Sequence, residues 1–172
     1  TGNALGQFAN QILQGNSPLT KGERELIAAY VSYLNNCSFC AESHAAVATC
    51  HLGEIPIQQL KSGNFDDSGF SAKMKALLKI AKKVQISGKS VSKEDVENAK
   101  SSGASDEEIH DAVIVAAAFC MFNRYVDGLG THTAQPNEYL DMGKLLAKKG
   151  YKQPPFFLRW LIRKVLDKQF NH

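Results

Sequence analysis

The chain has 172 residues, of which 44% are hydrophobic and 22% charged, and its formal net charge is +3. These values predict one compact domain over residues 1–172 and exclude a disordered or collagen-like chain. The net charge is too small to favour nucleic acid as a partner. No apolar run reaches the roughly 18 residues that cross a bilayer, so we expect no membrane partner.

The four cysteines, Cys37, Cys40, Cys50 and Cys120, are too few for a disulfide scaffold. The first residues, TGNALGQFAN, lack the basic start and apolar stretch of a signal peptide, so we expect a cytoplasmic protein. In that reducing compartment a C-x-x-C sequence is more often catalytic or metal-binding than a structural disulfide.

The expected elements are helices from the start. A capping box at residues 20–23 begins a helix whose apolar stripe continues to Leu34. Asn36 is a favourable N-cap for a second helix from about Cys37 to His51, and Gly53 is expected to end it.

Further helices are expected along the rest of the chain. Pro56 opens a short helical turn, and apolar residues between 74 and 84 mark another long helix. Ser92 caps the next, which ends at Gly103. A capping box at 105–108 begins a nearly all-apolar helix that ends near Gly128, and such a helix is central in a bundle or buried at a subunit interface. Segments 137–150 and about 155–170 close the chain, the last as a basic amphipathic helix docked on the domain or a neighbouring subunit. No strand is expected, so the predicted fold class is all-α.

The stretch NNCSFCAESH, residues 35–44, places three reactive side chains on one helix face. At roughly 100° per residue, Cys40 lies about 60° and His44 about 20° from Cys37 around the axis. Cys40 and His44 are then close enough for a thiol–imidazole contact. Both cysteines fall in the first turn, where free N–H groups and the helix dipole favour the thiolate. A low-pKa cysteine beside a base, with a second cysteine near it, suits two-electron thiol chemistry.

The same residues allow two alternatives. Cys37, Cys40, His44 and Cys50 are spaced almost as in a small zinc knuckle, with His51 as a further ligand. In a continuous helix, however, Cys50 is rotated about 220° from Cys37, so tetrahedral zinc would need a ligand from elsewhere. A structural disulfide is the other alternative. We expect redox chemistry, with no metal and no cofactor.

Glu25 lies 12 residues before Cys37, and the sequence alone does not distinguish it from Glu23, a solvated surface residue. The spacing Glu25-x11-Cys37-x2-Cys40-x3-His44 resembles the E-x11-C-x2-C-x3-H signature of the AhpD-like alkylhydroperoxidases, within the carboxymuconolactone decarboxylase superfamily. The similarity extends over LTKGERELIAAYVSYLNNCSFCAESHAAVA and EDVENAKSSGASDEEIHDAVIVAAAFCMFNRYVDGLGTH, together roughly residues 4–132.

The resemblance implies a cysteine-based peroxidase with an antioxidant role, on an AhpD-like helical bundle that forms homo-oligomers (trimers, hexamers or dimers). Its partners would be a hydroperoxide substrate and a thiol or dithiol electron donor. By the same resemblance, Cys40 attacks the peroxide, Cys37 supplies a proton and then forms the Cys37–Cys40 disulfide, and His44 and Glu25 form the proton relay. The helix geometry alone does not choose which cysteine attacks.

Phe39 is a departure from this family. Its better-known members carry a second histidine immediately before the second cysteine, so a relay through that histidine is missing here. An apolar Phe39 would favour an organic hydroperoxide over hydrogen peroxide. The decarboxylase relatives lack the cysteine pair, which argues against lactone decarboxylation. Two further functions stay open: a non-enzymatic zinc-binding or redox-sensing assembly protein, and a disulfide reductase that recycles a peroxiredoxin.

Apart from this stretch and Glu25, we expect no catalytic residue. Cys120, in VAAAFCMF, is expected to be a small buried hydrophobe. Arg124 and Asp127 are expected to make an ion pair or a subunit contact. The other candidates are expected to be structural or on the surface: Cys50, His51, His110, Asn123 and His132.

Overall fold

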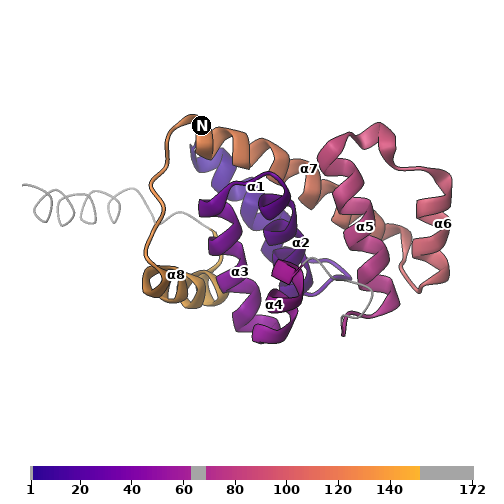
Figure 1. Ribbon diagram of the computed structural model, residues 1–172, viewed down its shortest axis with the longest axis horizontal. Helices are drawn as coiled ribbons and strands as arrows, with labels where there is room; N and C mark the ends of the chain where they lie inside the picture. The colour runs from indigo at the N-terminus through magenta and orange to yellow at the C-terminus, as the bar shows by residue number, and fades with distance from the viewer. Residues whose placement is uncertain (1, 63–68, 152–172) are drawn as a thin grey trace, which may run out of the picture.

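The computed structural model describes residues 2–62 and 69–151, and all regular structure in these ranges is helical, which confirms the all-α prediction. Figure 1 shows how the helices are arranged. The α-helices are α1 (Gly2–Gln14), α2 (Lys21–Leu34), α3 (Ser38–Leu52), α4 (Glu54–Ser62), α5 (Ala72–Ile86), α6 (Lys93–Ser101), α7 (Asp106–Gly128) and α8 (Pro136–Lys149), with a 3₁₀ turn, η1 (Gly88–Ser90), after α5.

Three of the helices begin at the capping residues that the sequence predicted. At α2, Thr20 Oγ1 accepts from the Glu23 N–H (3.2 Å), and Glu23 Oε2 accepts from the Thr20 N–H (2.8 Å). Ser92 and Ser105 begin α6 and α7 with the same reciprocal arrangement. Each box satisfies backbone N–H groups that have no partner inside the helix, which fixes where the helix starts.

The prediction that Asn36 caps α3 was wrong. Asn36 has φ 57°, the left-handed region that asparagine tolerates better than most residues. Its N–H donates to the Tyr33 carbonyl (3.0 Å), and the Cys37 N–H donates to the Ser32 carbonyl (3.0 Å). This is the pattern of a Schellman motif, so Asn36 ends α2 and Cys37 takes the cap position of α3.

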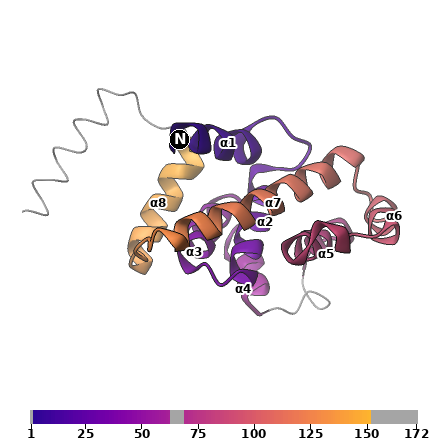
Figure 2. The same ribbon diagram turned by 90° about the horizontal axis from the view of Figure 1, so that it is seen from above.

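The long helix α7 crosses the molecule (Figure 2), and its buried side chains belong to the hydrophobic core. It packs on α1, α2, α5 and α6, and also touches α3. By length and composition α7 could cross a membrane, but the core helix of a soluble protein meets the same criteria. The prediction of a central helix is therefore confirmed, although Met121 and Tyr125 remain 43% and 48% exposed on one face.

At the end of the molecule opposite α5 and α6, α8 packs on α3 (Figure 1). The two helices approach closely at Gly143, where an added Cβ would lie 2.8 Å from the carbonyl carbon of Ala46. The chain then returns to α1, and the Tyr151 N–H donates to Asn10 Oδ1 (3.0 Å). The amphipathic helix predicted at about 155–170 lies outside the described residues.

Candidate functional site

The packing of α2 against α3 brings Glu25 and His44 together. Glu25 Oε2 lies 2.7 Å from His44 Nδ1, and both side chains are buried, with Glu25 0% and His44 9% exposed. Glu23, two residues earlier, is only partly buried and serves the capping box instead. The expectation that Glu25 contacts His44 is therefore met in the geometry, and Glu25 is not a solvated surface residue.

Two residues that the sequence reasoning missed complete the surroundings of Glu25. Gln14 Nε2 donates to Glu25 Oε1 (3.1 Å), and the Tyr151 hydroxyl lies 2.9 Å and 3.0 Å from the two carboxylate oxygens. Burial, followed by the nearby charge of Glu25, raises the pKa of Tyr151 well above its usual value, so its hydroxyl stays protonated. No spacing in the sequence links either residue to Glu25, because they come from opposite ends of the described chain.

The two cysteines sit at the start of α3 as buried free thiols, with Cys37 0% and Cys40 4% exposed. The prediction that the helix start favours their thiolates was wrong. Burial raises the pKa of Cys40, although hydrogen bonds with Cys37 and Asn123 act in the opposite direction. Burial and then a hydrogen bond to Asp127 raise the pKa of Cys37 to about 12. Loss of hydration outweighs the helix terminus here, because a thiolate loses its water when buried.

Asn123 is a further residue of the site that the sequence reasoning treated as structural. It is 1% exposed, and its amide is oriented from both sides: Oδ1 accepts from Asn35 Nδ2 (2.8 Å), and Nδ2 donates to Ser32 Oγ (3.0 Å). Asn35 is itself held by Gln85 Nε2 (2.8 Å). The network places a neutral amide beside the sulfur of Cys40.

Arg124 and Asp127 do not pair with each other in the described part of the chain. Arg124 Nη1 donates to the Cys120 carbonyl (2.8 Å), whereas the Asp127 carboxylate takes the hydrogen bond of the Cys37 thiol. The predicted ion pair was therefore wrong, because the two side chains leave α7 toward different partners, whereas the alternative of a subunit contact stays a prediction. Cys120 is half-buried rather than buried, with its sulfur 3.8 Å from Asn35 Nδ2.

A pocket of about 260 Å³ opens beside Cys40 and His44. Phe39 lines it, as expected, and the remaining walls are mostly apolar. The other lining residues are Ala9, Ser43, Phe119, Phe122, Val126, Met142, Leu146 and Tyr151. The imidazole of His44 is held edge-on against Phe119 at a centroid distance of 4.5 Å, so the pocket has a fixed wall on that side. It can receive a small apolar molecule next to a thiol and a base.

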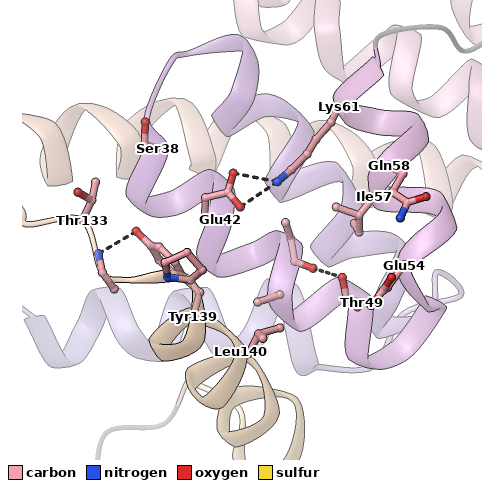
Figure 3. Close-up of a pocket in the computed structure, with 14 residues that line it drawn as sticks. Ser38, Glu42, Thr49, Glu54, Ile57, Gln58, Lys61, Thr133, Tyr139 and Leu140 are labelled. Atoms are coloured by element: carbon pink, nitrogen blue, oxygen red, sulfur yellow. Dashed lines mark hydrogen bonds and ion pairs between the residues drawn. The ribbon is translucent and has the colours of Figure 1, made fainter.

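A larger groove, of about 600 Å³, lies between α3, α4 and α8 and is drawn in Figure 3. Two of its charged residues, Glu42 and Lys61, form an ion pair (3.0 Å), and the Tyr139 hydroxyl accepts from the Ala134 N–H (3.1 Å). Neither Cys37 nor Cys40 is among its lining residues. Cys40 and His44 line the smaller pocket instead, whereas Cys37 lines neither of the two.

The remaining candidates lie away from the pocket. Cys50 is exposed near the end of α3 while Cys37 and Cys40 are buried, which fits the rotation expected from the sequence. Within residues 2–62 and 69–151, no group of three or more His, Cys, Asp or Glu side chains could hold a metal ion. His110 and His132 are exposed, as expected for surface residues.

The chain has similarities to known proteins. The family described as "CMD: Carboxymuconolactone decarboxylase family" matches residues 1–83. An uncharacterized peroxidase-related protein from Silicibacter sp. TM1040 is 28% identical, with a TM-score of 0.71 over 80% of this chain and 71% of that one. A structure titled "alkylhydroperoxidase AhpD core", an uncharacterized peroxidase-related protein from Ralstonia eutropha JMP134, is 26% identical, with a TM-score of 0.71 over 82% and 73%. No curated protein matches the chain.

Proposed function

Because the chain belongs to the carboxymuconolactone decarboxylase superfamily, in its AhpD-like branch, we propose that it is a cysteine-based alkyl hydroperoxide reductase that works in antioxidant defence. The observation that carries the proposal is the buried Glu25–His44 pair, 2.7 Å apart, in a site where His44 and Cys40 line one pocket. A carboxylate that orients a histidine beside a nucleophile is the general arrangement for removing the nucleophile's proton.

The raised pKa of Cys40 explains why the site needs a base. At neutral pH a buried thiol keeps its proton, so attack on peroxide requires a group that takes the proton as the sulfur reacts. His44 is that group in our proposal, and Glu25 stabilises the imidazolium that forms. The sulfur of Cys40 attacks one peroxide oxygen, the O–O bond breaks, and the products are a sulfenic acid on Cys40 and an alkoxide.

Cys37 acts twice in the proposed cycle. With a pKa of about 12 it holds its proton at neutral pH and can give it to the alkoxide, which is a stronger base than a thiolate, so an alcohol leaves. Its thiolate then attacks the sulfenic acid of Cys40, forming the Cys37–Cys40 disulfide, and the His44 imidazolium returns its proton so that the oxygen leaves as water. A thiol or dithiol donor returns two electrons and two protons to complete the cycle. We propose that this occurs in the cytoplasm and in a homo-oligomer.

The test is thiol counting on the reduced protein. Cumene hydroperoxide should consume the thiols of Cys37 and Cys40, leave Cys50 and Cys120 free, and yield one intramolecular disulfide by peptide mass mapping. Cys40→Ser should abolish peroxide consumption, whereas Cys37→Ser should stop at a sulfenic acid that dimedone traps. Cys50→Ser is the matched control and should behave as wild type. Peroxide consumption by Cys40→Ser at the wild-type rate would contradict the proposal.

The same preparation separates the other functions. About one zinc ion per chain in protein purified without chelators, with loss of thiol reactivity, would favour the zinc-binding assembly protein. Fast reduction of a peroxiredoxin disulfide without direct reaction with peroxide would favour the recycling reductase. The burial of Cys37 and Cys40 supports the small peroxide instead, because a disulfide on a folded protein is bulkier than the pocket beside them.

A further inference from the structure

Tyr151, the residue two positions after the end of α8, completes a triangle with Glu25 and His44. Its hydroxyl oxygen lies 2.9 Å and 3.0 Å from the Glu25 oxygens and 3.1 Å from His44 Nδ1. Its ring stacks on the imidazole at a centroid distance of 5.6 Å and an interplanar angle of 24°. The backbone N–H is tied to Asn10 Oδ1 on α1 (3.0 Å), so the position of the hydroxyl is set from two directions.

The donors and acceptors of Tyr151, Glu25 and His44 determine which of their atoms carry protons. The Tyr151 hydroxyl has one proton, which its raised pKa retains, and both Glu25 oxygens are within reach of it. Gln14 Nε2 supplies a second donor to the carboxylate. His44 Nδ1 then faces two acceptors, Glu25 Oε2 and the Tyr151 oxygen, so the proton of a neutral imidazole belongs on Nδ1. Nε2 keeps its lone pair.

We infer that Tyr151 is a positioning residue that fixes His44 in the Nδ1–H tautomer and so reserves Nε2 as the base. The inference rests on the proposed function for its catalytic consequence, but the tautomer itself does not depend on it. Without the hydroxyl, the fully buried Glu25 loses one of its donors. Nδ1 also loses one of its two acceptors, so less holds the imidazole proton on Nδ1, and the Nε2–H tautomer, which has no base at Nε2, gains population.

The test compares Tyr151→Phe with wild type and with Tyr33→Phe. Tyr33→Phe is the matched control, because it removes a Tyr–Glu hydrogen bond of similar length (3.1 Å, to Glu42) outside the pocket. In ¹⁵N-histidine-labelled protein, the nitrogen shifts of His44 should report the Nδ1–H form in wild type and Tyr33→Phe. They should report a mixture of tautomers in Tyr151→Phe. Unchanged shifts in Tyr151→Phe would overturn the inference.

Kinetics provide the second readout. The rate constant for Cys40 oxidation by cumene hydroperoxide should fall roughly 10- to 100-fold in Tyr151→Phe, as expected for loss of one hydrogen bond to a charged group. Because Tyr151 acts through Glu25, adding Tyr151→Phe to Glu25→Gln should change the rate by less than about twofold. A full additional loss in the double variant would indicate a merely structural role and overturn the inference.

The role of Tyr151 can still be decided if the wild-type protein does not react with hydroperoxides or if Tyr151→Phe does not fold. If wild-type protein does not react with hydroperoxides, the proposed function fails, while the His44 shifts still decide the role of Tyr151. If Tyr151→Phe does not fold, Asn10→Ala serves instead, since it removes only the backbone tether of Tyr151. It should shift the His44 tautomer in the same direction to a smaller extent, and no shift would count against the inference.

Discussion

Replacing Glu25 by glutamine should nearly abolish the reaction with hydroperoxide while preserving the fold. The glutamine has the same shape but exchanges one acceptor oxygen for an NH₂ group. All three neighbours of Glu25 point nitrogen or hydroxyl donors at it: Gln14 at 3.1 Å, His44 at 2.7 Å and Tyr151 at 2.9 Å. At least one donor would then face another donor, and His44 would lose the charge that stabilises its imidazolium.

The magnitude follows from the role of the base. A positioned general base contributes roughly 100- to 10,000-fold to a rate, and His44 depends on Glu25 for its orientation and charge. We expect the rate constant for Cys40 oxidation to fall by about 100-fold or more. Stability should change less, by about 1–3 kcal/mol, because relief from burying a charge offsets part of the lost hydrogen bonding.

Glu23→Gln provides a matched control on the same helix. Glu23 is only partly buried, and its carboxylate serves the start of α2, where Oε2 accepts from the Thr20 N–H (2.8 Å). A glutamine can keep one acceptor there, so the oxidation rate should stay within about twofold of wild type. The assay is rapid mixing of reduced protein with cumene hydroperoxide, quenched and read as thiol loss, together with urea unfolding. Equal rates for Glu25→Gln and Glu23→Gln would refute the reasoning.

Other perturbations test the packing, the thiols and the pocket. Gly143→Ala should lower the free energy of unfolding by about 1–2 kcal/mol, because the clash with the α3 backbone outweighs the gain in helix propensity of about 1 kcal/mol. In the control Gly128→Ala an added Cβ meets no atom within 4 Å, so the free energy of unfolding should not fall. Iodoacetamide should alkylate exposed Cys50 first. The alkylation rate of Cys37 in the folded protein should keep rising with pH beyond 9, because burial holds the pKa of its thiol at about 12. In urea the alkylation rate should level off near the ordinary thiol pKa of about 8.5. An early plateau for Cys37 in the folded protein would contradict this assignment. Phe39→His should lower the ratio of the rate constants for cumene hydroperoxide and hydrogen peroxide, and an unchanged ratio would show that pocket polarity does not select the substrate.

Much of the helical framework was predictable because its causes are local. In the capping boxes at Thr20, Ser92 and Ser105, each accepting side chain lies three residues from the backbone N–H that donates to it. Such a short spacing can be recognised in the sequence alone. Asn36 shows where local reasoning fails. Asparagine is favourable both as an N-cap and in the left-handed position that ends a helix, and the choice depends on how α2 and α3 meet.

The ionisation of the cysteines was not predictable from the helix start alone. The position of Cys37 and Cys40 at the beginning of α3 follows from the sequence, and a helix start by itself favours a thiolate. Desolvation, however, depends on what covers the thiols, and both are almost completely buried. Asp127 adds to this effect at Cys37, through a contact from α7 that no spacing in the sequence indicates.

The sequence by itself determined the all-helical fold and the placement of the Cys37-x-x-Cys40 pair one turn before His44. These features depend on helical periodicity, which relates residues a few positions apart. Only the tertiary structure decided that Glu25, which the family signature had singled out, is buried against His44, that Asn123 and Asp127 face the thiols, and that Tyr151 closes the triangle. The physical reason is that burial and contacts between distant segments set charge and orientation, and those depend on how the helices pack rather than on how each one forms.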